Sequence, residues 1–286
     1  MTIAVTGSTG HLGGLVIEAL LEHLPAPRVL ALARDTTRAR ALADRGVEVR
    51  TFDYDRPDTL APALEGVDRL LLVSGNAVGN RVAQHRAVIE AASAAGVRFL
   101  AYTSVLHADT ATGPVAPEHR ETEAILAHAP FEVALLRNGW YSENYLPTAQ
   151  QAVASGEVLT SAGSGRVASA ARADYAAAAA AVLAADTPRP GTYELSGDHA
   201  WDTAELARTI ASLSGHEVRV HEVSPDEHLR LLVGAGVPEG GAEFVVGTDR
   251  AISRGELADT PGTLSALIGR PTTPLADTLR PALTQS

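Results

Sequence analysis

The chain has 286 residues, of which 45% are hydrophobic and 20% charged, and its formal net charge is −11 at pH 7. This is the composition of an ordinary globular protein, and the acidic balance argues against binding to nucleic acid or to an anionic membrane surface. The sequence contains no cysteine and no lysine, which excludes disulfides, thiolate chemistry and Schiff-base chemistry. No basic leader precedes the first apolar stretch, so we expect no signal peptide and a cytoplasmic protein.

Short apolar runs alternate with helical patterns through the first half of the chain. The runs expected to form strands are residues 2–5, 29–33, 47–52, 69–73, 97–103 and 132–136. Helical patterns cover about 12–24, 36–45, 57–65, 80–95 and 115–128. This alternation predicts an α/β fold, a doubly wound parallel sheet of the Rossmann type with helices on both faces.

After residue 140 the pattern loosens. Strands are expected at 192–197 and 217–223, on either side of a helix that Asp202 caps. We interpret residues 1–140 as a dinucleotide-binding domain and 141–286 as a smaller, mixed substrate-side lobe, some of whose segments return to the main sheet. The longest apolar run, 175–185, is about half of the roughly 20 residues that span a bilayer, and we expect a packing helix there.

A glycine-rich turn follows the first predicted strand. Gly7, Gly10 and Gly13 have the spacing G-x-x-G-x-x-G at a strand-to-helix junction. In such a turn the first glycine allows a tight bend, the second lets the backbone approach a pyrophosphate, and the third lets the helix pack closely on the strand. The anion would be held by free amides at the helix N-terminus. The motif therefore predicts a dinucleotide site.

The end of the second predicted strand indicates which dinucleotide binds. Arg34 can pair with a 2′-phosphate, whereas Asp35 is better placed to cap the following helix. NADPH is therefore favoured, although Asp35 could instead point at the ribose of NADH.

The usual catalytic pair of Rossmann-type reductases, Tyr-x-x-x-Lys, cannot exist in a chain without lysine, and Leu106 stands four residues after Tyr102. A quinone is an acceptor that needs little acid catalysis, because hydride addition leaves a weakly basic, phenolate-like anion with a pKa of about 10 by analogy with tyrosine. A flat slot beside the nicotinamide and a few neutral donors would suffice.

The segment 135–145 follows a predicted strand and supplies such groups. Asn138 and Tyr141 can donate hydrogen bonds, and Trp140 and Tyr145 offer flat apolar surface. The alternative is that these aromatic side chains only pack the interface between the lobes.

Several segments together carry a resemblance to a known family: TGSTGHLGG, ALARD, QHRAVIEAA, AYTSVLHAD, EHRETEAIL, LLRNGWYSENYL, ASAARADYAAA and IGRPTTPLADTL. Over nearly the whole chain they resemble the bacterial NADPH-dependent quinone oxidoreductase 2 group of the NmrA-like atypical short-chain dehydrogenases. The resemblance implies an NADPH:quinone reductase without flavin. Two other functions stay open, a redox sensor that binds NADP(H) without turnover and a reductase of triarylmethane dyes.

The resemblance also implies a cofactor site built from the loop 7–12, the turn 74–76, the segment 138–143 and two arginines. The residues implied are Gly7, Ser8, Thr9, Gly10, His11, Leu12, Arg34, Ser74, Gly75, Asn76, Asn138, Gly139, Trp140, Tyr141, Ser142, Glu143 and Arg172. His11 departs from the glutamine that relatives often carry, which is expected to shift cofactor affinity. Arg172 and Asp174 have a second interpretation, as an ion pair between the lobes.

The candidate catalytic residues are Asn138, Tyr141 and His119. His119 could donate a proton near neutral pH, but a solvated surface histidine is the favoured interpretation. The histidines form no close ligand pair, so no metal is expected. The predicted partner is a small quinone-like substrate, and the oligomeric state is left open, with a homodimer as one alternative.

Overall fold

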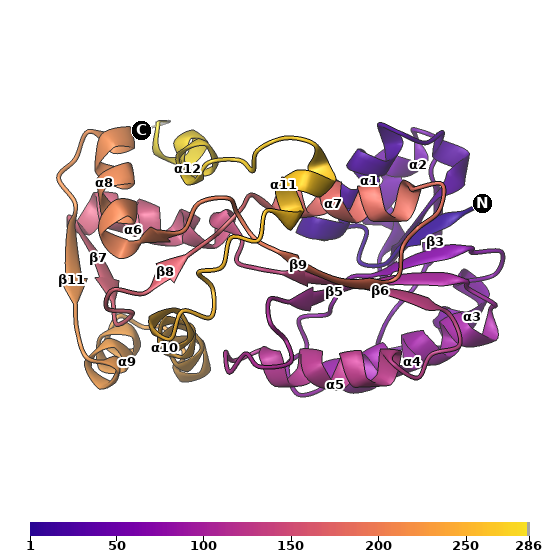
Figure 1. Cartoon of the computed structure of the whole chain (residues 1–286), viewed down its shortest axis with the longest axis horizontal. Coiled ribbons are helices and arrows are strands. Elements are labelled where there is room, and N and C mark those ends of the chain that lie inside the picture. The colour runs from indigo at the N-terminus through magenta and orange to yellow at the C-terminus, as the bar shows by residue number, and fades with distance from the viewer. Residues whose placement is uncertain (285–286) are drawn as a thin grey trace.

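A seven-stranded parallel sheet forms the centre of one half of the molecule in the computed structural model, which describes residues 1–284 (Figure 1). Its strands are β1 (Ile3–Val5), β2 (Val29–Ala33), β3 (Glu48–Thr51), β4 (Arg69–Leu72), β5 (Phe99–Val105), β6 (Glu132–Asn138) and β9 (Gly191–Leu195). Their order across the sheet is β3-β2-β1-β4-β5-β6-β9, and each neighbouring pair is parallel. The predicted Rossmann-type sheet is confirmed.

Helices cover both faces of this sheet. The first half of the chain contributes α1 (His11–Leu21), α2 (Arg40–Ala43), α3 (Leu60–Ala63), α4 (Arg81–Ala94) and α5 (Ala116–Leu126), with short 3-10 turns η1 (Ala26–Arg28), η2 (Thr36–Ala39) and η3 (Pro57–Thr59). The second half contributes α7 (Arg172–Ala184) and α11 (Thr263–Ile268). Figure 1 shows α1, α7 and α11 on one face and α3, α4 and α5 on the other.

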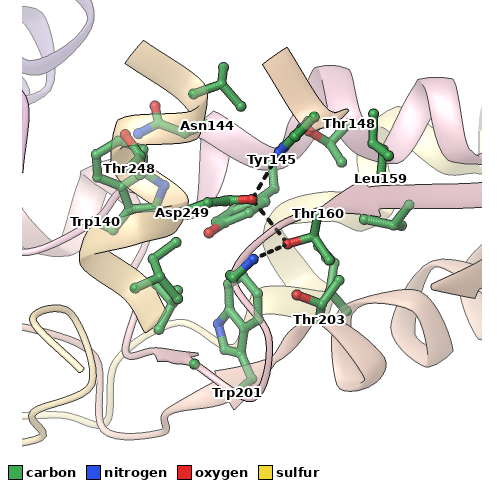
Figure 2. Close-up of a pocket in the computed structure, with 18 of the residues that line it drawn as sticks. Trp140, Asn144, Tyr145, Thr148, Leu159, Thr160, Trp201, Thr203, Thr248 and Asp249 are labelled. Carbon is green, nitrogen blue, oxygen red and sulfur yellow. Dashed lines mark hydrogen bonds and ion pairs between the residues drawn. The ribbon is translucent and has the colours of Figure 1, made fainter. Parts of the chain in front are cut away.

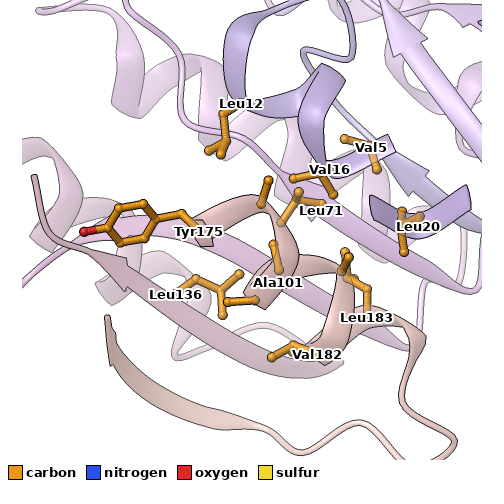
Figure 3. Close-up of a cluster of buried hydrophobic side chains, with 14 of the residues drawn as sticks. Val5, Leu12, Val16, Leu20, Leu71, Ala101, Leu136, Tyr175, Val182 and Leu183 are labelled. Carbon is orange, nitrogen blue, oxygen red and sulfur yellow. The ribbon is translucent and has the colours of Figure 1, made fainter. Parts of the chain in front are cut away.

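Alternate side chains of each strand point to opposite faces and build two separate cores. On β1, Ile3 and Val5 pack with the core beneath α1 and α7, whereas Ala4 packs with the core beneath α3 to α5. Figure 3 shows the first core, in which Leu71 and Leu136 of the sheet meet apolar side chains of the two helices. Both faces are buried, which explains the near-continuous apolar strand sequences.

The alanine-rich segment forms α7, which packs against α1. Small side chains allow two helices to approach closely, and Ala176, Ala179 and Ala180 are almost fully buried in this contact layer. No helix within residues 1–284 has the length and apolar character needed to cross a membrane.

The other half of the molecule is built after residue 140 around a separate core. It contains η4 (Ser142–Tyr145), α6 (Leu146–Ser155), α8 (Thr203–Ser214), α9 (Pro225–Gly234), α10 (Glu239–Ser253) and α12 (Leu275–Leu283). Two small sheets pair β7 (Glu157–Thr160) with β11 (Arg219–Glu222) in parallel and β8 (Arg166–Val167) with β10 (Trp201–Asp202) antiparallel. The predicted cap of α8 is confirmed, because the Asp202 carboxylate accepts the Glu205 amide at 2.8 Å. Although β9 and α7 lie in this part of the sequence, both belong to the main sheet layer.

Candidate functional site

The glycine-rich turn between β1 and α1 adopts the tight geometry that its spacing predicts. Gly7 has φ +57°, a left-handed conformation that favours glycine. A Cβ on Gly13 would lie 2.3 Å from the Gly7 carbonyl oxygen, so any other residue at this position would collide with the backbone. The helix can therefore begin directly against the turn only because Gly13 has no side chain.

The N-terminus of α1 carries backbone amides that no side chain caps, because its N-cap residue is Gly10. Two residues of the predicted loop have other roles. Ser8 is buried, and both its amide and its hydroxyl donate to the Leu32 carbonyl oxygen, at 3.2 and 2.9 Å, so neither is free for a phosphate. The Leu12 side chain belongs to the core beneath α1. Their side chains therefore stabilise the loop from within.

A cavity of about 740 Å³ opens beside this turn at the carboxyl ends of the strands. Its lining residues come from the glycine loop, the end of β2, the segment after β3 and the loop after β4: Gly7, Thr9, Gly10, His11, Arg34, Asp35, Arg38, Phe52, Asp53, Tyr54, Asp55, Gly75, Asn76, Ala77 and Gln84. Parallel α/β sheets place ligands at this edge.

Two arginines at the cavity edge have no acidic partner. Arg34 and Arg38 are exposed, and neither forms an ion pair with a carboxylate in residues 1–284. Asp35 lies between them, but its carboxylate accepts the amide and the hydroxyl of Thr37, at 3.0 and 2.6 Å, and so caps η2 as predicted. These hydrogen bonds lower the pKa of Asp35. The two guanidinium groups are therefore unpaired within residues 1–284, and the one carboxylate between them is already hydrogen-bonded to Thr37. This arrangement suits a phosphate group.

The loop after β4 is held from beneath by buried polar side chains. The Gly75 amide donates to His85 Nε2 at 3.1 Å, and Arg81 Nε donates to the Gly75 carbonyl at 2.7 Å. Tyr54 lies beside Gly75, and its hydroxyl is 2.7 Å from the carbonyl oxygen of Val73. Sequence reasoning missed Arg38, Tyr54, His85 and Gln84, because each acts from outside the predicted loops.

Asn138 ends β6 as a buried amide with one unpaired oxygen. Its Nδ2 donates to the Tyr141 hydroxyl at 3.2 Å, whereas no hydrogen-bond partner in residues 1–284 meets its buried Oδ1. Buried polar atoms almost always have a partner, so this oxygen points to a missing donor. Burial raises the pKa of Tyr141, despite the opposing effects of Asn138 and of the Arg172 guanidinium, which lies 4.8 Å from the centre of the tyrosine ring.

The segments RNGWYSENY and RADYA meet in space. The Glu143 carboxylate accepts the Arg172 amide at 2.9 Å at the start of α7, and the Ser142 hydroxyl lies 2.9 Å from that of Ser169. The interpretation of Arg172 and Asp174 as partners in an ion pair is wrong. Asp174 instead pairs with Arg270 at 2.8 Å, because its side chain projects from α7 toward the segment after α11.

A second pocket, of about 150 Å³, lies in the smaller half, next to Trp140 (Figure 2). Tyr145 and Trp201 meet edge to face, with ring centroids 4.7 Å apart, and Asp249 of α10 faces the same space. Trp140 and Tyr145 were predicted as flat apolar surface. Trp201 and Asp249 were missed, since they lie far away in the sequence and no local pattern distinguishes them.

His119 is buried in α5, so the favoured interpretation as a surface histidine is wrong. Its Nδ1 lies 2.7 Å from the hydroxyl of Tyr102, which is itself fully buried. Burial lowers the pKa of His119 to about 3, so the ring is neutral at pH 7 and has no proton to release as an imidazolium. It lines neither of the two pockets described above.

Comparisons with known proteins agree with this geometry. Residues 1–145 match the profile of the NmrA-like family. Quinone oxidoreductase 2 of Escherichia coli is 47% identical over 97% of both chains, and the crystal structure of that protein complexed with NADPH superposes with a TM-score of 0.95, covering 97% of this chain and 98% of that one. The triphenylmethane reductase of Citrobacter sp. complexed with NADP(H) is 40% identical, with a TM-score of 0.94 over 99% of this chain and all of the other.

Proposed function

This chain belongs to the NmrA-like family, and we propose that it is an NADPH-dependent quinone reductase. The segment 138–145 carries the proposal. It begins at the unpaired amide oxygen of Asn138 and ends at the aromatic wall of the second pocket, so one short stretch of chain serves both a cofactor and an acceptor.

The residues present fit NADPH. The uncapped amides of α1 suit the pyrophosphate, and Arg34 with Arg38 suits the 2′-phosphate, since neither guanidinium has a protein counter-ion in the described chain. The unpaired Asn138 Oδ1 would accept an amide hydrogen of the nicotinamide carboxamide. When bound, NADPH supplies the hydride.

The second pocket, next to Trp140, is the one we assign to the electron acceptor and call the acceptor pocket. Its volume is that of one aromatic ring. Cavities of about 150 Å³ lined by apolar side chains bind benzene. Trp140, Tyr145 and Trp201 provide flat surfaces against which a quinone ring can lie.

Neutral donors stabilise the oxygen that becomes negative during reduction. Asn138 donates to the Tyr141 oxygen, which leaves the phenolic hydrogen of Tyr141 free for the acceptor. Since burial raises the pKa of Tyr141, that hydrogen is retained at neutral pH. A preorganised donor of this kind lowers the barrier as charge develops, and the weakly basic hydroquinone anion can take its proton from water.

One assay tests the proposal and separates it from the sensor alternative. Purified protein is mixed with a panel of single-ring quinones, and the absorbance of NADPH is followed with NADH in parallel. We expect steady turnover with a preference for NADPH. Tight NADPH binding without oxidation by any quinone would contradict the enzyme and support a sensor. We also propose a cytoplasmic location, in keeping with the cysteine-free acidic sequence. The homodimer stays a prediction that the mass in solution would test.

A further inference from the structure

The acceptor pocket contains a feature that a plain quinone does not use. Among its lining residues, Asp249 is the only one with a carboxylate. It projects from α10 toward the aromatic side chains that form the opposite walls (Figure 2). A quinone offers only hydrogen-bond acceptors, and its oxygens become more negative on reduction. A carboxylate close to them would repel the ring.

The two carboxylate oxygens of Asp249 have different surroundings. Oδ2 accepts the Ser161 amide at 2.6 Å and the Thr160 hydroxyl at 3.1 Å, and it lies 3.2 Å from the Ser161 hydroxyl and 3.3 Å from His228 Nδ1. No donor within residues 1–284 is in hydrogen-bond range of Oδ1. The protein therefore fixes the side chain through one oxygen and leaves the other available in the pocket.

Carboxylates bind donors and cations, and aromatic faces also attract cations. The faces of Trp140, Tyr145 and Trp201 surround the same space as Asp249. The nearby negative charge also has an effect on the protein itself, because burial and the Asp249 carboxylate together raise the pKa of Tyr145. The pocket thus combines a space the size of one aromatic ring with one negatively charged side chain, that of Asp249.

We propose that this pocket selects single-ring quinones whose substituent is a hydrogen-bond donor or a cation, such as a hydroxyalkyl or an ammonium group. Asp249 is then the specificity-determining residue. The inference rests on the proposed function and deepens it. The substituent binds Asp249 Oδ1, which keeps the quinone carbonyls away from the carboxylate. Hydroxyls attached directly to the quinone ring are excluded from this class, since they are acidic and would meet Asp249 as anions.

Matched substrates test the role of Asp249 in turnover. The kcat/KM of hydroxymethyl-1,4-benzoquinone and of (trimethylammonio)methyl-1,4-benzoquinone is compared with that of methyl-1,4-benzoquinone, in the wild type and in Asp249→Asn. For each protein, the kcat/KM of the substituted quinone is divided by that of methyl-1,4-benzoquinone. Comparing this ratio between the wild type and the variant cancels the intrinsic reactivity of each quinone. One charge-assisted hydrogen bond at a partly open site corresponds to about tenfold, so we expect Asp249→Asn to reduce the preference by about that factor.

Asp226→Asn is the matched control. It removes the same charge from α9, where the Asp226 side chain is 94% exposed and lies outside the pocket lining. The preference should survive this change. The amide in Asp249→Asn retains an oxygen for the Ser161 amide, and an unchanged melting temperature would show that the fold is intact. A ratio that is the same in the wild type and in Asp249→Asn overturns the proposal.

A binding measurement needs neither turnover nor a variant. The chain has two tryptophans, Trp140 and Trp201, and both line this pocket, so intrinsic fluorescence reports its occupancy. In the absence of NADPH, hydroxymethyl-1,4-benzoquinone should bind about tenfold more tightly than methyl-1,4-benzoquinone, which has no hydrogen-bond donor for Asp249. Equal affinities overturn the inference. If the binding preference is present but no quinone oxidises NADPH, the selectivity is supported and the proposed function is contradicted.

Discussion

The sharpest prediction about cofactor choice concerns the two arginines at the cavity beside the glycine-rich turn. Arg34 and Arg38 line the cavity, and neither has a carboxylate partner in residues 1–284. Replacing either by alanine removes a cation that we propose binds the 2′-phosphate, a group that NADH lacks. NADPH affinity should therefore fall, whereas NADH affinity should change by less than about twofold.

The expected loss of NADPH affinity can be estimated from the exposure of these two side chains. A hydrogen bond to a charged group contributes about 1.5–3 kcal/mol, and solvent screening at an exposed site places each arginine near the lower value. About 1.5 kcal/mol is roughly a tenfold change in Kd. The double variant should lose up to about a hundredfold if the two contributions add, and less if both arginines bind the same oxygen.

Titration calorimetry with NADPH and NADH measures these changes directly. Arg40→Ala is the matched control, because Arg40 is an exposed arginine close in sequence that does not line the cavity. The preference for NADPH should also shrink as salt rises, since exposed charges are screened over about 8 Å at physiological ionic strength. If Arg34→Ala weakens NADPH and NADH equally, the assignment of this site to the 2′-phosphate is refuted.

Three further predictions concern the turn, the donors and the buried histidine. Gly13→Ala should destabilise the fold by at least about 2 kcal/mol and abolish NADPH binding, since its Cβ would lie 2.3 Å from a carbonyl oxygen, whereas Gly14→Ala, with its nearest contact at 3.5 Å, should be tolerated in a thermal melt. Tyr141→Phe and Asn138→Ala should lower kcat about tenfold to a hundredfold and NADPH affinity less, and unchanged kcat in both variants would remove them from the site. Because the pKa of His119 is near 3 in the fold and about 6.5 when unfolded, the unfolded chain alone takes up this proton below about pH 6.5, and stability should fall by up to roughly 1.4 kcal/mol per pH unit toward pH 3. His119→Gln should reduce that slope in urea titrations without abolishing it, because burial also lowers the pKa of His85 to about 3. An identical slope would place the proton uptake elsewhere.

The sheet could be predicted from the sequence because its signals are local. Buried parallel strands are nearly continuous apolar runs, and the glycine turn places backbone constraints on neighbouring residues. The same holds for Asp35 and Asp202, whose carboxylates cap the turn or helix that follows each of them in the chain. Such features are determined by residues a few positions apart, so inspection of one segment is enough.

The rest of the site depends on contacts between distant segments. Trp201 comes to the pocket on β10 and Asp249 on α10, and neither is marked by spacing or composition. Asp174 looked like a partner of Arg172 because the two are close in sequence. On α7 its side chain points elsewhere and binds Arg270, which is nearly a hundred residues later. Long-range geometry of this kind is set by packing, which the sequence pattern does not display.

The absence of lysine and the burial of Tyr102 lead to the same conclusion about chemistry. In this fold, a tyrosine can act as an acid at the substrate only if it reaches the substrate and a nearby cation lowers its pKa. Tyr102 meets neither condition, because it is fully buried against His119 and burial raises its pKa. Tyr141 is the tyrosine that we propose assists the reaction, and its own raised pKa makes it a hydrogen-bond donor and a poor acid. Acceptors that form strongly basic alkoxides should therefore react slowly, whereas acceptors whose reduced form is a stabilised, weakly basic anion suit the donors that this chain provides.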